Sequence, residues 1–343
     1  MLISEYVKSY VAAMDELAGA LRPRYVDTPA KAGLYESLYL TAHHPAEPQA
    51  LWIRHTVLKP PGGQPRASLW CTWFASGGVR AGKVTTPGPV TTPDRPLQIG
   101  DHGWIGADGA VGAIDLAGLQ ARWDLKFNSP EPPMHHLPKR WMYSAPVPRT
   151  KSMSAAPMLR LSGSLDVDGQ GVDIDGWPCS IGHNWGTEHA ERWIWVHADA
   201  DSDQGPIWLD VVVGRVRLGP VTTPWIANGA VSIAGRRHRL GGLRPGAGTH
   251  VTEEGRGATV QLRGNDVAVA LHATVHRSNC VAWTYADPAG HTSEVVNSSV
   301  APIVLQIRPS DGDEAVEVTA PVSAFELGAP KRAFDVPIQS FPD

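Results

Sequence analysis

The chain has 343 residues, of which 42% are hydrophobic and 19% are charged, so it can form one large domain or two medium ones, and two are favoured. The net charge is −4 and the basic residues form no long run, which argues against nucleic acid and anionic membrane surfaces as partners. Cys71, Cys179 and Cys280 are widely spaced with no CxxC pair, so we do not expect a disulfide framework. We expect a reducing, cytoplasmic compartment instead. We expect neither a signal peptide nor a transmembrane segment, because no apolar run reaches about 20 residues.

Residues 4–21 are predicted to form an amphipathic helix. Apolar side chains recur there at helical spacing, Ser4 can cap the start, and Pro23 ends the pattern. The polar face is not basic, so we expect the helix to cover an open end of a β-structure rather than to bind a membrane.

The rest of the chain is predicted to be all-β. Short β-like runs are separated by turns rich in the 35 glycines and 30 prolines, and their spacing is typical of an antiparallel sandwich or barrel. The expected strands are 34–42, 50–58, 67–75, 110–115, 119–128, 158–167, 171–177, 192–198, 207–216, 258–263, 267–275, 281–286, 293–300, 302–308 and 316–325.

One proline-rich segment is the best domain boundary. Residues 129–157 hold seven prolines and show no clear strand period, which is typical of a connector across the surface or the mouth of a barrel. The sequence therefore predicts a helix in 1–24, a first domain in 30–150 that includes the connector, and a second domain in 151–343.

The segment 176–197 is the strongest candidate for a site, because it combines three histidines and four tryptophans with Glu188. Alternation predicts that Trp193, Trp195 and His197 share one strand face, and that 182–186 is a loop or bulge before that strand. We expect a pocket with indole walls, or alternatively a structural corner that satisfies buried backbone. The polar and aromatic candidates in this segment are His183, Asn184, Trp185, Glu188 and His189.

Zinc is a rival interpretation of the same segment. His183, His189 and His197 supply three imidazoles, which is enough for a catalytic zinc site. The helical HExxH spacing is absent, however, so we predict no metal.

Three further acids are candidates. Glu36 lies on the same predicted face as three leucines, where it could form a buried ion pair with Arg54 of the next strand or act as an acid with a shifted pKa. Asp124 lies on a charged face that is either exposed or turned into a wet lumen. Asp210 lies within an apolar strand and needs a partner or a chemical role.

Tryptophan outnumbers phenylalanine by 13 to 5. Indole supplies a large flat apolar surface and the strongest cation–π face. This composition suits a long unsaturated or polycyclic ligand, and also a carbocation formed by protonating an alkene.

Several short motifs are similar to the carotenoid hydratase, tocopherol-cyclase-like and AttH-like group of lipocalin-related proteins. They are Tyr35–Tyr39, Ala50–Arg54, Arg122–Leu125, Ser154–Gly169 and Gly182–Gly186, the last of which matches a His-x-Trp-Gly element. The resemblance implies two tandem lipocalin-like (calycin) antiparallel β-barrels, isoprenoid- or polyketide-like ligands, and no metal or organic cofactor. Its members include hydratases and cyclases, and fold similarity alone does not name a reaction.

We therefore predict a cofactor-independent hydratase or cyclase that acts on a hydrophobic unsaturated small molecule. Glu36, Asp124, Glu188 or Asp210 would donate the proton, and His183 or His189 would orient water or take the proton back. The expected ligand-binding residues are Trp185, Asn184, Trp193, Trp195, Trp52, Arg54, Trp123 and Tyr143. A carrier that binds the same ligand unchanged is the alternative, and a β-sandwich hydrolase or carbohydrate binder is disfavoured because no GxSxG element occurs.

Overall fold

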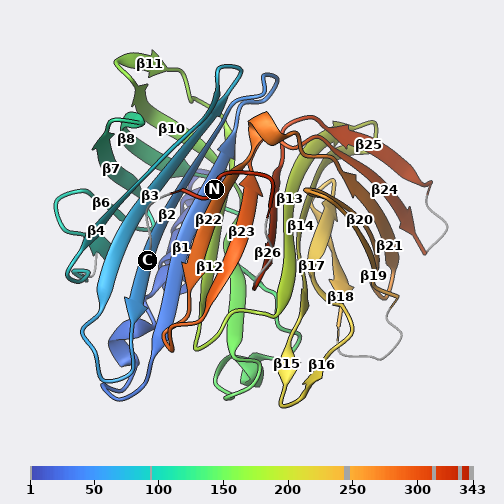
Figure 1. Cartoon of the computed structure of the whole chain (residues 1–343). Helices are drawn as coiled ribbons and strands as arrows, with labels where there is room; N and C mark the ends of the chain where they lie inside the picture. The colour runs from blue at the N-terminus through green and yellow to red at the C-terminus, as the bar shows by residue number, and fades with distance from the viewer. Residues whose placement is uncertain (1, 93–94, 243–247, 311–313, 331–333, 340–343) are drawn as a thin grey trace.

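Antiparallel strands make up nearly all of the regular structure, as the sequence predicts (Figure 1). The computed structural model describes residues 2–92, 95–242, 248–310, 314–330 and 334–339. These strands form two large bodies that lie side by side, one built on a twelve-stranded sheet and the other on a seven-stranded and a five-stranded sheet.

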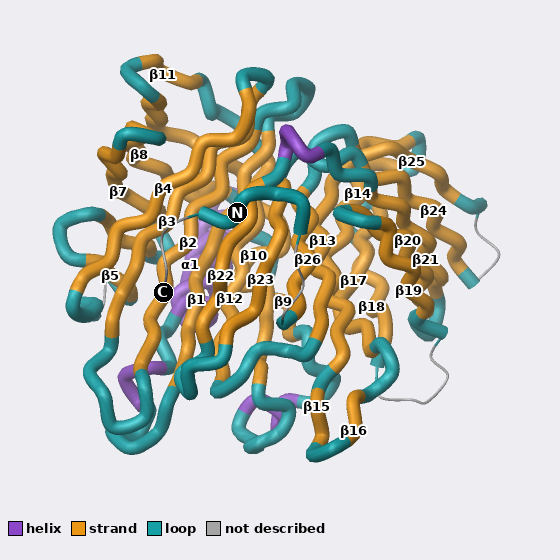
Figure 2. The backbone as a smooth tube through the Cα atoms, viewed as in Figure 1, coloured by secondary structure: helices purple, strands orange, loops and turns teal. Residues whose placement is uncertain are grey.

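The expected N-terminal helix is present as α1 (Leu2–Leu21). Leu17, Ala20 and Leu21 of its last turns are buried in the core of the first body. Figure 2 shows the helix behind β1 and β2 of the first sheet. None of the described helices combines the length and the apolar character needed to cross a bilayer.

The first sheet has the strand order β4-β3-β2-β1-β12-β10-β8-β7-β6-β5, with β9 and β11 paired to β10. Among the described strands, no hydrogen-bonded pairing joins the end strands β4 and β5, so the expected barrel is not closed by its backbone. The strands are β1 (Leu34–His43), β2 (Ala50–Lys59), β3 (Arg66–Ala75), β4 (Gly78–Thr86), β5 (Leu97–Ile99), β6 (Gly103–Ile105), β7 (Gly109–Leu116), β8 (Leu119–Asn128), β9 (Met134–His135), β10 (Thr150–Val167), β11 (Gln170–Val172) and β12 (Pro178–Gly186).

The second body is a sandwich of two sheets around an aliphatic core. The seven-stranded sheet contains β18 (Arg236–Gly241), β17 (Ile226–Ile233), β14 (Gly205–Arg215), β13 (Arg192–Ser202), β26 (Ala324–Ala329), β23 (Thr292–Ser298) and β22 (Val281–Ala286) in that order. The five-stranded sheet contains β19 (His250–Glu254), β20 (Gly257–Arg263), β21 (Val267–Ala273), β24 (Ile303–Pro309) and β25 (Val316–Ala320). The short pair β15 (Arg217–Leu218) and β16 (Val221–Thr222) projects from the seven-stranded sheet between β14 and β17. The described residues also form three 3-10 turns: η1 (Tyr25–Asp27), η2 (Arg140–Tyr143) and η3 (Arg277–Asn279).

Two sequence-based expectations about the chain path differ from the structure. Residues 182–186, expected as a loop or bulge, belong to β12, which is hydrogen-bonded to both β1 and β10. The expected domain boundary at residue 150 lies within the first sheet, because β10 and β12 follow the connector and still pair with β8 and β1. The change from one sheet to the other comes between β12 and β13.

The two bodies meet through aromatic side chains. Strands β22 and β23 are drawn beside β1 in Figure 1. The indole of Trp283 on β22 packs edge-on against Trp70 of β3, with ring centroids 4.9 Å apart, and is 6.3 Å from Trp52 of β2. Such contacts stabilise a pair of sheets beyond simple area burial. We call the region where the twelve-stranded sheet meets the seven-stranded sheet the inter-sheet interface.

Candidate active site

A cavity of about 550 Å³ lies at the inter-sheet interface. Strands β1, β2, β10 and β12 of the first sheet form one wall, and strands β13, β14, β17, β22 and β26 form the other. Residues between positions 136 and 148 of the connector also contribute to the lining. The volume falls in the range usual for small-molecule sites, which are mostly apolar with a few placed polar groups.

Strand alternation explains which side chains reach the cavity. Tyr35, Ser37 and Tyr39 of β1 line it, while Leu38 and Glu36 on the opposite face point into the core beneath α1. On β13, Trp193 and Trp195 line the cavity in the same manner. The rings of Tyr39 and Trp195 meet edge-on with centroids 5.2 Å apart, so the two sheets touch at this point.

A histidine and a carboxylate form a hydrogen-bonded pair at the cavity wall. His189 Nδ1 donates to Asp287 Oδ1 at 2.6 Å, and the backbone N–H of His189 donates to the same oxygen at 2.8 Å. The imidazole stacks on Tyr35 with ring centroids 3.9 Å apart. Because Nδ1 carries the hydrogen, Nε2 keeps the lone pair, and no described residue is hydrogen-bonded to it. This arrangement fixes the tautomer and leaves one nitrogen for proton transfer.

A second carboxylate lies among the aromatic side chains of the same wall. Glu326 of β26 accepts a hydrogen bond from Trp193 Nε1 at 2.8 Å and from Tyr285 Oη at 2.9 Å. His189 lies close to both donors, with its ring centroid 5.7 Å from Trp193 and 5.9 Å from Tyr285. The two acid–base groups of the wall, His189–Asp287 and Glu326, are therefore linked through two shared rings.

Arg54 supplies the cation of the cavity wall. Its Nε donates to Ser37 Oγ at 2.7 Å, and its guanidinium carbon lies 3.8 Å from the centroid of the Tyr285 ring. Arg54 is 6% exposed, so its charge acts in a dry environment where electrostatic effects are strong.

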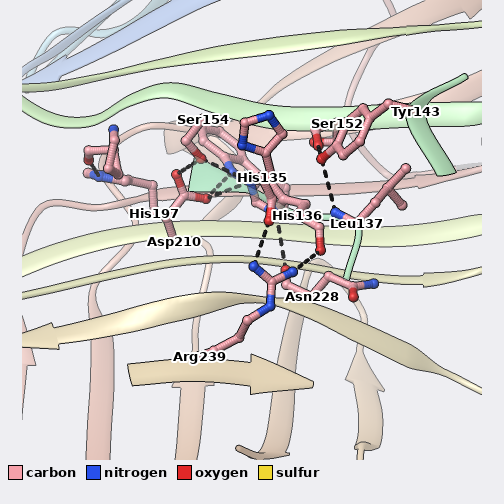
Figure 3. A network of polar contacts seen from close by, with 12 residues as sticks. His135, His136, Leu137, Tyr143, Ser152, Ser154, His197, Asp210, Asn228 and Arg239 are labelled. Carbon is pink, nitrogen blue, oxygen red and sulfur yellow. Dashed lines mark hydrogen bonds and ion pairs between the residues drawn. The ribbon is translucent and has the colours of Figure 1, made fainter. Parts of the chain in front are cut away.

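A polar network holds the connector against both bodies (Figure 3). His136 Nε2 is 2.9 Å from Ser154 Oγ, which donates to Asp210 Oδ2 at 2.6 Å, and Trp195 Nε1 donates to Asp210 Oδ1 at 3.1 Å. His136 Nδ1 is 3.1 Å from the carbonyl oxygen of Asn228. Because both nitrogens of His136 are engaged, this network positions the connector and offers no nitrogen to a ligand.

The same network continues to the outer part of the connector in Figure 3. Arg239 donates to the carbonyl oxygens of His135 and His136, and Tyr143 Oη donates to the carbonyl of Ser152 at 2.7 Å. Burial raises the pKa of Tyr143 to about 12, so it remains a neutral donor at any physiological pH. The connector is thus a fixed part of the cavity wall in this structure.

The structure brings some of the predicted site residues together and separates others. Six of them line the cavity: His189, Asn184, Trp193, Trp195, Trp52 and Arg54. Asp210 lies behind Trp195, and Glu188 forms an ion pair with Arg149 without lining the cavity. The rings of Trp185 and Tyr143 pack at a tilt with centroids 5.7 Å apart, Trp123 is buried in the first core, and Asp124 is exposed on β8.

Glu36 forms a different buried pair from the one expected. The register of β1 and β2 places Arg54 opposite Tyr39 and Glu36 opposite Val57, so Glu36 and Arg54 lie on opposite faces. Glu36 Oε1 instead lies 2.7 Å from His183 Nε2, and its oxygens accept the backbone N–H groups of residues 24 and 25. His183 Nδ1 is 2.7 Å from the carbonyl oxygen of Ala20 in α1. Glu36 and His183 therefore connect the helix to the first core.

The three histidines considered for zinc do not converge. His183 pairs with Glu36, His189 pairs with Asp287, and the Nε2 of His197 lies 2.8 Å from the carbonyl oxygen of Pro157. His197 lies two residues beyond Trp195 on β13, and this direction along the strand leads away from His189. This zinc set is therefore excluded.

Sequence reasoning missed Glu326, Tyr285 and Asp287. They come from strands β22 and β26 or the turn after β22, about 100 residues or more beyond His189. Glu326 did carry a signal, because it is the one charged residue in the otherwise apolar strand AFELGA. Asp287 follows a strand in a turn, where an aspartate is ordinary, so nothing local marked it.

Comparison with known proteins gives a fold but no activity. No family model matches the chain. An uncharacterised protein of Mycobacterium tuberculosis, Rv0493c, is 26% identical over 314 residues, which cover 86% of this chain and 87% of that protein. The solved structure of CghA matches with a TM-score of 0.57 and 13% identity over 91% of this chain and 92% of its own.

Two further solved structures match over similar lengths. A proposed AttH from Nitrosomonas europaea has a TM-score of 0.47 and 12% identity over 89% of this chain and 95% of its own. Kievitone hydratase from Nectria haematococca has a TM-score of 0.48 and 10% identity over 91% of both chains. The chain therefore shares the all-β fold of CghA.

Proposed function

We propose that this protein is a cofactor-independent hydratase or cyclase whose substrate is a hydrophobic, unsaturated small molecule of isoprenoid or polyketide type. One observation carries the proposal: the His189–Asp287 pair presents a single free ring nitrogen at the wall of a mostly apolar cavity. A site that only stored a hydrophobic ligand would have no need of an oriented acid–base group there.

The proposed reaction needs one proton transfer from His189 to the substrate and one transfer back to His189. Protonated His189 gives the proton on Nε2 to an alkene carbon, the neighbouring carbon becomes cationic, and water or an internal oxygen attacks it. The attacking oxygen then loses its proton to Nε2, so that a hydration adds one water in total and a cyclisation changes no atoms. Asp287 stabilises the imidazolium through its bond to Nδ1.

The wall around His189 suits a developing positive charge. The rings of Trp193 and Tyr285 present π-faces, and the carboxylate of Glu326 lies between their polar atoms. Cation–π attraction and a fixed negative charge stabilise a cation most in a site from which water is excluded. Arg54, which packs on the Tyr285 ring and lines the cavity, is suited to an oxygen atom of the ligand.

Incubation with a panel of unsaturated isoprenoids and polyketide enones, followed by liquid chromatography and mass spectrometry, tests the proposal. A hydratase yields a product heavier by one water, and a cyclase yields an isomer with a new retention time. A ligand that quenches tryptophan fluorescence and is recovered unchanged supports the alternative of a carrier.

Matched tryptophan variants locate the binding site in the same assay. Trp193→Ala removes a cavity wall and should weaken binding about 5- to 150-fold, since one stacked ring contributes about 1–3 kcal/mol. Trp104→Ala, on β6 and outside the cavity lining, is the control and should bind as the wild type does. Equal affinity of both variants would place the ligand elsewhere.

A further inference from the structure

Two buried histidines and a partly buried aspartate, all able to bind metal, meet at the inter-sheet interface beyond the cavity. His43 is the last residue of β1, and His197 and Asp199 lie on the facing strand β13. One ligand atom of each residue lies within 4.8 Å of the ligand atoms of the other two. Tyr39, four residues before His43 on β1, and Trp195, two residues before His197 on β13, separate this cluster from the cavity.

The hydrogen bonds of His197 fix its tautomer. Its Nε2 lies 2.8 Å from the carbonyl oxygen of Pro157, which can only accept, so Nε2 carries the hydrogen. The lone pair is then on Nδ1, and this atom is buried and has no hydrogen-bond partner among the described residues. A histidine that donates one N–H to a backbone carbonyl is oriented as metal-binding histidines usually are.

His43 is held in the same tautomer by a different route. The hydroxyl of Thr41 donates to Ser299 Oγ at 3.2 Å, so its oxygen accepts from His43 Nε2 at 3.3 Å. The Nδ1 of His43 therefore also keeps a lone pair, and it is likewise buried without a hydrogen-bond partner within the described chain. It lies 3.7 Å from Asp199 Oδ1, too far for a hydrogen bond.

Asp199 completes a set of three acceptors that face one another. Its Oδ1 is also buried with no partner in the part of the chain that the structure describes. Two lone pairs and a carboxylate oxygen at this separation repel one another, and each is costly to bury unpaired. A cation between them removes both penalties.

We propose that His43, His197 and Asp199 bind one divalent first-row transition-metal ion, with Zn²⁺ as the natural probe, and that the ion joins the two sheets. Two imidazoles and one carboxylate are a ligand set for Zn²⁺ or Fe²⁺ rather than for Mg²⁺ or Ca²⁺. In a tetrahedral zinc site the ligand atoms lie about 3.3 Å apart, so the three side chains need to move only slightly closer together to bind the ion. The site differs from the metal-free expectation drawn from the family resemblance.

The partial exposure of Asp199 allows the ion to enter from solvent and a water molecule to act as the fourth ligand. The side chain of Asp199 is 22% exposed while that of His43 is 1% exposed, so the site opens to solvent on the Asp199 side. Water can complete the coordination there. Arg160 lies near enough to affect Asp199 electrostatically, which weakens binding without filling the site.

Metal titration of the chelator-treated full chain tests this proposal. We expect one Zn²⁺ per chain by calorimetry, visible bands typical of a nitrogen- and oxygen-ligated site with Co²⁺, and a melting temperature several degrees higher with Zn²⁺ than with chelator. Asp199→Asn and His43→Gln should each weaken Zn²⁺ binding at least about 100-fold and abolish the melting shift. Asp201→Asn, an exposed residue on the same strand, is the control and should leave both unchanged.

Circular dichroism of each variant confirms folding before the titration. Asp199→Asn changes a partly exposed group without altering its shape, so this variant keeps the test valid if His43→Gln does not fold. Absence of stoichiometric Zn²⁺ binding, or binding that Asp199→Asn leaves unchanged, would overturn the metal site. Either result leaves the proposed function untouched, since His189 and Asp287 take no part in the cluster.

Discussion

His189 Nδ1 lies 2.6 Å from Asp287 Oδ1, although the two residues are 98 positions apart in the sequence. Asp287 is buried and its carboxylate also accepts the backbone N–H of His189, so the imidazole is held in one orientation. Stacking on Tyr35 of the first sheet fixes the ring from its face. The acid–base group of the cavity thus depends on both bodies of the fold.

The charge of Asp287 is expected to be necessary for turnover but not for ligand binding. Asp287→Asn keeps an oxygen that can accept from Nδ1 and removes the negative charge that stabilises the imidazolium. We expect the rate to fall about 100-fold at unchanged affinity. Steady-state kinetics with a converted substrate checks this, with the exposed Asp203→Asn as control. An unchanged rate would show that Asp287 is only structural.

The buried pair of Glu36 and His183 is expected to act on stability and not on the reaction. Removing one partner leaves a buried charge or polar group unpaired, so Glu36→Leu and His183→Leu should each lower the free energy of unfolding by about 3–5 kcal/mol. The double variant should recover part of that loss, which urea unfolding measures. If a folded single variant lost turnover at full stability, the pair would belong to the catalytic machinery.

A glycine is expected to control the position of Trp193. A Cβ built on Gly328 would lie 2.1 Å from the Trp193 indole, and strand β26 leaves no room for the glycine to move away. Gly328→Ala should therefore displace the indole and weaken ligand binding at least about 10-fold. Fluorescence titration checks this against Gly171→Ala, where no atom lies within 4 Å of the added Cβ. Wild-type affinity in Gly328→Ala would mean that the indole does not contact the ligand.

His55 is expected to make the fold sensitive to acid. It is fully buried, neither ring nitrogen has a hydrogen-bond partner in the described chain, and burial lowers its pKa to about 3. The unfolded chain binds a proton at about pH 6.5, so between pH 6.5 and 3 the unfolded state holds the extra proton and stability falls as pH falls. From pH 7 to pH 5 this one group costs about 2 kcal/mol.

Replacing His55 by leucine tests that assignment. His55→Leu should raise the free energy of unfolding at pH 7, because two unpaired polar atoms are removed, and the gain should grow at pH 5. Urea unfolding at both pH values measures the difference, with the exposed His276→Leu as control. A gain that did not depend on pH would contradict a neutral, buried imidazole.

The sequence was sufficient for the class of fold and for one wall of the cavity. Alternation places Trp193 and Trp195 on one face of β13, where both line the cavity, and the helix from the first residues also agrees with the structure. Local patterns determine these features, because the side-chain period of a strand depends only on neighbouring positions.

The rest of the site depends on register and on long-range pairing. The pairing of Arg54 with Tyr39 rather than with Glu36 depends on the hairpin that joins β1 and β2, and a shift of one residue would reverse the faces. The hydrogen bond between Trp193 and Glu326 depends on the pairing of β13 with β26, although the two residues are 133 positions apart in the sequence. No local pattern carries that information.

The fate of solvent deuterium with a converted substrate tests the central claim most directly. In D₂O the wild-type protein should place one carbon-bound deuterium in the hydrated product, because the alkene takes its proton from the Nε2 of His189. His189→Asn, which keeps a donor for Asp287 but has no basic nitrogen, should bind the substrate and incorporate deuterium at least about 100-fold more slowly. Product without deuterium, or incorporation at the wild-type rate in His189→Asn, would contradict proton transfer by His189.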